Sequence, residues 1–366
     1  MGSAATTPRP APRPTPGRDP AAVLLAIAAA LTAATAVLVV ALVLGRAGAA
    51  PGTAGALTVW GLPIARLVMD VAALGTIGLL LLGGFLLPAE RERLAQPARA
   101  VVRTSVWWAL AWAGSAVVTG ALTMSDIAGR PVTEVLTPQA VRTFAGSTSQ
   151  GRALVLVVGL ATVLALCARR TRTVNDAWLL LVLAALTVVP PALTGHSADA
   201  AGHDLATLSL VLHMLAASAW VGGLGALVIY GRGAAASGPT PSRYSQLAFG
   251  CYVLVGVSGL VNATIRLGGW PGAVGELWGS RYGWLLLGKL AAFAILGAFG
   301  WWHRSSTLPA LAGGRPAAFA RFATVELVVM LLAVALAVAL SRSPTPVPEG
   351  GHGVALQPVA RTQLTS

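Results

Sequence analysis

The chain has 366 residues, of which 56% are hydrophobic and only 10% are charged, and its formal net charge at pH 7 is +13. A chain this apolar is not an ordinary soluble domain. The positive charge does not indicate a nucleic-acid partner, because the arginines lie in short segments between long apolar blocks and form no continuous basic face. The blocks predict an all-α, polytopic transmembrane helix bundle.

Apolar blocks of about membrane length predict the helices in chain order. Residues 1–20 are rich in Pro, Ala, Thr and Arg and are expected to form a disordered cytoplasmic N-terminus. We expect the first four helices to occupy residues 21–175, a second transmembrane domain to occupy 176–345, and a flexible C-terminal tail to occupy 346–366. The nine predicted helices are 21–44, 62–87, 102–125, 153–168, 176–194, 205–230, 246–267, 282–302 and 318–341.

The first block also has features of a secretory signal, with Ala47-Gly48-Ala49 as a cleavage site. Its apolar core is longer than the usual run of about 7–15 residues, which favours a retained helix. Farther along the chain, the small residues Gly222-Gly223-Leu224-Gly225 predict close helix packing.

The distribution of arginine between the predicted loops indicates the orientation. With the N-terminus inside, fifteen arginines lie in inner segments and eight in outer segments, while Arg66 lies inside a span. The positive-inside rule therefore favours an N-in, C-out topology. In this topology the loop that holds His196 and His203 faces outward, and it contains no arginine.

His213 is the most informative residue of the chain. About eight apolar residues on either side place its imidazole inside the hydrocarbon, where an ionisable side chain is costly unless it binds a ligand or is hydrogen-bonded to another helix. Imidazole and thioether ligands suit copper, so His213, Met214, His196 and His203 are the candidate metal ligands. No spacing typical of a metal site, such as HxxxH, is present, and a hydrogen-bonded neutral ring is the alternative for His213.

Other polar side chains lie at a similar depth. A rise of about 1.5 Å per residue places Asp70, Lys289 and Asn262 within ~8–12 Å of the predicted outer surface, with His213 among them. Lys289 is the one lysine in a chain with twenty-four arginines. Lysine loses its proton when desolvated, whereas arginine effectively does not. Glu326 lies nearer the inner face and belongs to a later step of the same path.

Each of these residues also has a purely structural explanation. Because Arg66 and Asp70 are four residues apart, they are able to neutralise one another. His303 at the inner interface is explained by the aromatic belt of the tryptophans before it. The remaining alternatives are snorkelling for Lys289, an interhelical hydrogen bond for Asn262, packing for Met214, and an ion pair with Arg321 or a loop cation for Glu326.

No Walker motif, GxSxG elbow, HExxH or GxGxxG following a strand is present, so the sequence offers no support for an enzyme of those classes. The stretch Leu212–Leu224 resembles the signature helix of the CopD family of bacterial copper-resistance membrane proteins. Ser258-Gly259-Leu260, Tyr282–Leu290 and the helix with Arg321 and Glu326 are similar to the rest of that domain, in the same order. The resemblance covers roughly residues 190–345.

This resemblance implies a multi-pass protein of the bacterial plasma (inner) membrane that transports copper ions, with uptake from the outer side. It also implies a small periplasmic copper carrier of the CopC type as a partner. Many relatives carry a second domain that resembles oxidase copper-assembly proteins, so such a protein is another candidate partner.

Two alternatives stay open. A His-bearing helix followed by Trp and Gly, with a later membrane Lys, also resembles protoporphyrinogen oxidases of the HemJ type. That resemblance implies haem b, with His213 as an axial ligand and Lys289 as a catalytic or propionate partner. The other alternative is an assembly partner that delivers copper to a respiratory oxidase without transporting it. The longer match favours copper transport.

Overall fold

A computed structural model describes the larger part of the chain. The helix expected at 21–44 lies outside the described residues, except for Thr35. Eight helices in the described part are long and apolar enough to cross a membrane, and they follow the order of the other eight predicted blocks. The prediction of an all-α polytopic bundle is confirmed. The described residues are 35, 54–194, 203–230, 239–267, 272–307 and 316–343.

Long helices make up most of the described structure. Two of them, α2 and α11, continue into short π-helices. The long elements are α2 Ala56–Leu81 with η1 Leu82–Leu86, α3 Gln96–Ala128, α6 Ser149–Ala168, α7 Val174–Ala192, α8 His203–Tyr230, α9 Thr240–Arg266, α11 Arg281–Trp302 with η3 His303–Thr307, and α13 Pro316–Ser341. The short ones are α4 Val132–Val135, α5 Pro138–Ser147, α10 Gly272–Gly279, and the antiparallel pair β1 Ala89–Glu90 and β2 Arg93–Leu94.

Polar side chains fix where several helices begin. The hydroxyls of Thr148, Thr173 and Ser280 each accept a hydrogen bond from the third backbone amide beyond, at 2.9–3.1 Å. At α7 the carboxylate of Asp176 also accepts the Thr173 amide, at 3.0 Å, which completes a capping box. These caps satisfy amides that the first helical turn leaves without a partner.

Several helices extend beyond the apolar blocks that predicted them. The predicted helix 246–267 begins at Thr240, with Pro241 in its first turn. The predicted helix 102–125 begins at Gln96 and ends before Gly129, whose φ of 61° terminates it. The apolar blocks underestimate these helices because polar turns at the membrane surface remain helical without contributing to the hydrophobic pattern.

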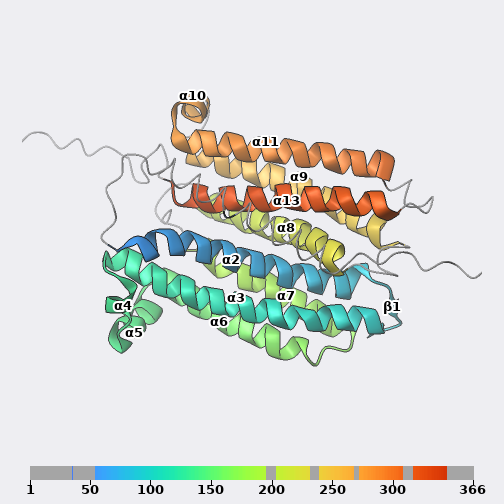
Figure 1. Cartoon of the computed structure of the whole chain (residues 1–366), viewed down its shortest axis with the longest axis horizontal. Coiled ribbons are helices and arrows are strands. Elements are labelled where there is room, and N and C mark those ends of the chain that lie inside the picture. The colour runs from blue at the N-terminus through green and yellow to red at the C-terminus, as the bar shows by residue number, and fades with distance from the viewer. Residues whose placement is uncertain are drawn as a thin grey trace, which may run out of the picture.

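The long helices form two groups that meet along α2 and α8 (Figure 1). The first group contains α2, α3, α6 and α7, and the second contains α8, α9, α11 and α13. The short helices α4, α5 and α10 lie at one end of the bundle, which we call the distal end. The β1–β2 pair and η3 lie at the other end, which we call the basic end. The arginines of this end whose side chains are described are Arg91, Arg93, Arg99, Arg103, Arg169, Arg170, Arg172, Arg243 and Arg304.

The two groups approach each other most closely at two glycines. A Cβ atom added to Gly78 on α2 would collide with the backbone carbonyl of Gly222 on α8, and one added to Gly222 would collide with the carbonyl of Leu74. The prediction that Gly222 and its neighbours permit close packing is confirmed. Because the contact is between backbones, it fixes the relative height of α2 and α8.

An ion pair links the two groups near the distal end. Arg342, just beyond α13, donates to both carboxylate oxygens of Asp126 on α3, at 2.9 and 3.3 Å. The two side chains are 18% and 34% exposed, so water screens the pair only in part. A bidentate arginine–carboxylate pair of this kind is more specific in geometry and stronger than a pair with a single hydrogen bond.

We expect a double-mutant cycle of Asp126→Asn and Arg342→Gln to give a coupling energy of about 1 kcal/mol, at the upper end for surface pairs. The measurement is thermal unfolding of the purified protein in detergent, with the two single variants and the double variant compared. The exposed pair Arg130–Glu134, at 3.0 Å, is the control, and we expect a smaller coupling there. Strictly additive effects at Asp126 and Arg342 would contradict the prediction.

Candidate functional site

One face of α8 points between the helices of the second group. His213, Trp220 and Leu224 lie seven and four residues apart, so at 3.6 residues per turn they share one face. Gly222, which contacts α2, lies nine residues from His213 and therefore about 180° around the helix. His213 consequently faces away from α2, toward α9.

Two residues of α9 hold the His213 ring. Its Nδ1 atom lies 3.1 Å from the Ser258 hydroxyl, and that hydroxyl donates its proton to the Leu254 carbonyl at 2.5 Å. In the tautomer in which Nδ1 donates to Ser258, the lone pair of Nε2 is left for a ligand. A Cβ atom on Gly259 would lie 3.3 Å from the ring, so the missing side chain makes room for it.

Asn262 stabilises the same contact between helices. Its amide donates to the Ser209 hydroxyl of α8 at 2.8 Å and to the Ser258 carbonyl at 2.9 Å. Asn262 thus forms the interhelical hydrogen bond considered for it, and it acts on His213 through Ser258. The sequence does not mark Ser209 and Ser258 as positioning residues, because a serine in a membrane helix carries no signal of its own.

Lys289 on α11 is the last member of this set of side chains. We call the set the outer group; it comprises Ser209, His213, Ser258, Asn262 and Lys289. Its charge acts electrostatically on His213. Within the described part of the chain no residue accepts a hydrogen bond from the Lys289 ammonium group. A half-buried lysine beside an imidazole makes this place unfavourable for a tightly held cation.

Asp70 lies at the same depth but belongs to a different cluster. Measured from the contact between Gly78 and Gly222, Asp70 and His213 are about 12 and 13.5 Å farther along their helices. Asp70 interacts electrostatically with Arg66, which also interacts with Asp126 and Arg342. Since α2 packs against the side of α8 opposite His213, Asp70 belongs to the cluster around Arg66 and not to the outer group.

The structure describes the remaining predicted ligands only in part. His196 lies outside the described residues, and only the backbone of His203 is described. His203 begins α8, about 15 Å along the helix from His213, so the two cannot bind one ion. Met214 packs half-buried against the core. The described residues contain no group of three or more His, Cys, Asp or Glu side chains placed to hold a metal ion.

Glu326 on α13 has a partner that differs from those considered for it. Its carboxylate lies 3.1 Å from Nε2 of His303, and the two side chains are only 7% and 12% exposed. His303 is therefore more than a residue of the aromatic belt. It begins the π-helix η3, and π-helical turns are frequent at functional sites. The two residues lie on separate helices, so no sequence spacing could have revealed the pair.

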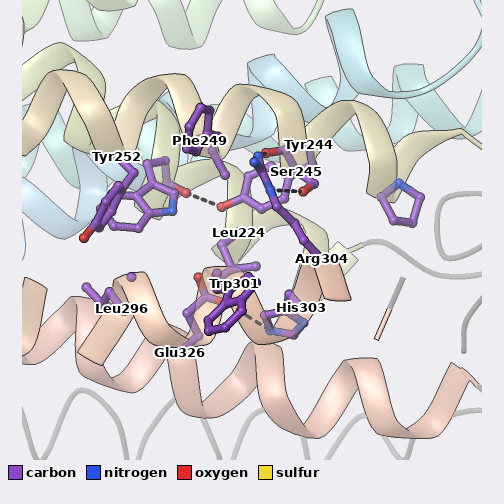
Figure 2. Close-up of a pocket in the computed structure, with 15 residues that line it drawn as sticks. Leu224, Tyr244, Ser245, Phe249, Tyr252, Leu296, Trp301, His303, Arg304 and Glu326 are labelled. Atoms are coloured by element: carbon purple, nitrogen blue, oxygen red, sulfur yellow. Dashed lines mark hydrogen bonds and ion pairs between the residues drawn. The ribbon is translucent and has the colours of Figure 1, made fainter. Parts of the chain in front are cut away.

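The His303–Glu326 pair lies in an aromatic cavity of about 320 Å³ near the basic end (Figure 2). Tyr244 donates to the Trp220 carbonyl at 2.8 Å. Arg304 donates to the backbone and side chain of Ser245. Its guanidinium carbon lies over the Phe249 ring, 4.4 Å from the ring centroid. The lining residues are Trp220, Leu224, Pro241, Tyr244, Ser245, Ala248, Phe249, Tyr252, Leu296, Gly297, Gly300, Trp301, His303, Arg304 and Glu326.

Three aromatic rings lie on the side of the cavity nearer the outer group, and two of them, Trp220 and Tyr252, also line it. Tyr252 and Phe293 stack in parallel with ring centroids 4.2 Å apart, and Trp220 meets Tyr252 edge-on at 5.5 Å. Along their helices, Trp220 is about 10 Å from His213 and Phe293 about 6 Å from Lys289. The outer group, the aromatic rings and the cavity therefore follow one another along α8, α9 and α11.

The fold defines a multi-pass, all-α membrane protein with polar groups enclosed between its helices. Two family models match it: Copper resistance protein D over residues 239–340, and the Copper resistance protein D-like, N-terminal domain over residues 56–207. The chain belongs to the CopD family, which associates it with copper resistance. No curated protein and no solved structure matches the chain.

Only part of the outer group lies within a matched region. Ser258, Asn262 and Lys289 lie within the Copper resistance protein D match, as do both members of the His303–Glu326 pair. His213 lies between the two matched regions. The stretch Leu212–Leu224, on which the resemblance to a signature helix was based, is thus outside both matches, although α8 packs directly against the matched helix α9.

Proposed function

We propose that this protein moves copper ions through the bacterial plasma membrane from the outer side, and that it acts as a transporter and not as an enzyme. The observation that carries the proposal is the His213 imidazole, whose Nδ1 atom lies 3.1 Å from the Ser258 hydroxyl inside a membrane helix bundle of a copper-resistance family. Imidazole is a ligand that suits copper.

The surroundings of His213 favour a site through which copper passes, as opposed to one that stores copper. Few protein ligands surround it, and the charge of Lys289 acts on it. Conduction requires binding that is favourable enough for an ion to arrive and weak enough for it to leave. A transit site with one imidazole and a neighbouring cation meets both requirements.

The direction and the partners follow from the two ends of the bundle. The positive-inside rule assigns the basic end to the cytoplasm and the distal end to the outside. Copper would then arrive at the distal end, where a CopC-type carrier is the proposed donor; His196 and His203 remain candidate first ligands. If the protein instead delivers copper without transporting it, the proposed recipient of that copper is an oxidase copper-assembly protein.

The test is copper flux in vesicles of phosphatidylethanolamine and phosphatidylglycerol that contain the purified full-length protein. We expect copper, supplied as Cu(I) or as Cu(II), to accumulate above the level of protein-free vesicles. No accumulation with either ion would overturn the proposal. An absorption spectrum of the same sample tests the rival function, because a Soret band that His213→Ala removes would indicate a haem protein.

A further inference from the structure

The cavity at the basic end contains side chains that the proposed function has not used. We infer that this cavity is a second copper site, with the His303 imidazole and the Glu326 carboxylate as its protein ligands, from which the ion leaves toward the basic end. The inference rests on the proposed function, because it names the next position on the same path.

The geometry of the pair fits a shared metal ion. Nε2 of His303 and Oε2 of Glu326 are 3.1 Å apart, on two different elements. With metal–ligand bonds of about 2.0–2.1 Å, an ion held by both atoms would have an N–metal–O angle of about 100°. That angle lies within the range of ordinary four-coordinate sites. Imidazole and carboxylate are both established ligand types for transition metals.

The cavity supplies what the two residues lack. Its volume of about 320 Å³ compares with ~30 Å³ for a water molecule in the liquid, so an ion there can keep several waters as additional ligands. Tyr244 and Ser245 also line the cavity. The described residues offer no third His, Cys, Asp or Glu, which keeps the site weak.

Stability does not explain this pair. Burying an acid–base pair costs desolvation energy that its attraction often fails to recover, so a buried pair is a poor device for stability alone. Intramembrane ionisable groups are typical of ion pathways and proton relays. Glu326 is 6% exposed and lines a cavity instead of packing into the solid core, which favours a role in binding.

The position of the pair continues the path from His213. Lys289 of the outer group and His303 lie on the same face of α11 and its π-helical extension, about 21 Å apart along the axis. The stacked rings of Tyr252 and Phe293 separate the two sites. Arg304 lies at the cavity, where its charge opposes long residence of a cation and favours release.

The test is a count of bound copper on the full-length protein after anaerobic dialysis against Cu(I), repeated with Cu(II). We expect about two ions per wild-type chain. Glu326→Gln, which keeps the side-chain volume, and His303→Asn should each remove one ion, and His213→Ala should remove the other. Phe249→Leu is the control, because it lines the same cavity without supplying a ligand, and it should leave the count unchanged.

The outcomes separate the two proposals. An unchanged count in both Glu326→Gln and His303→Asn, or a loss equal to that of Phe249→Leu, overturns the second site. Loss of one ion in these variants, in a protein without copper flux, supports the second site while the transport proposal fails. Gel filtration of each variant shows that it is folded, and with two independent substitutions one unfolded variant does not remove the test.

Discussion

Replacing His213 with alanine is expected to reduce copper-dependent accumulation in cells to the level of cells without the protein, while the protein still inserts into the membrane. The substitution removes the imidazole nitrogen, and the hydroxyl and amide groups that remain in the outer group are poor ligands for copper. The measurements are copper content per cell and the amount of protein in the membrane fraction.

Two matched substitutions distinguish a ligand from a packing residue at this position. Ser258→Ala keeps the imidazole but removes its hydrogen bond, so we expect an intermediate loss of about 10–100-fold in copper affinity. Met214→Leu should stay near the wild-type level, because Met214 packs half-buried against the core. Normal accumulation with His213→Ala would contradict the role given to the imidazole.

The second large effect is expected from Gly222→Ala. The added methyl group would meet the backbone of α2, which cannot move away as a flexible side chain can. Overpacking of a well-packed contact typically costs 1–3 kcal/mol, and we expect about 3 kcal/mol here because both sides of the contact are backbone. The measurement is the thermal unfolding midpoint of the purified protein in detergent.

Gly225→Ala on the same helix is the control for this prediction. A Cβ atom there would lie 3.6 Å from the side chain of Leu327, which is ordinary contact distance. We expect its effect to stay within about 0.5 kcal/mol. Equal unfolding midpoints for the two alanine variants would show that the contact between α2 and α8 is looser than the structure indicates.

The membrane helices were predictable from the sequence because the bilayer imposes a simple requirement. Every backbone polar group in the hydrocarbon must be satisfied within its own segment, so a long apolar block is almost certain to be a helix. The ends were less predictable. The helix predicted at 246–267 begins six residues earlier, at Thr240, because its first turns are polar and their helicity depends on Pro241 and on contacts with the rest of the bundle.

The depth of the candidate site was also predictable, since it depends only on counting along a single helix. His213, Asn262 and Lys289 do lie together in the outer group. The sequence did not indicate Ser209 or Ser258, because serine has many uses in membrane helices and only the neighbouring helix shows which one applies.

By itself, then, the sequence determined that the protein is a helical membrane bundle and where along its helix each of these polar residues lies. Only the tertiary structure decided which of those residues meet. Asp70 and His213 lie at a similar height along their helices but belong to different clusters, because α2 packs against the side of α8 opposite His213 through Gly78 and Gly222. Glu326 meets His303 for the same reason: position along a helix is a local property, whereas the partner of a side chain depends on the packing of other helices around it.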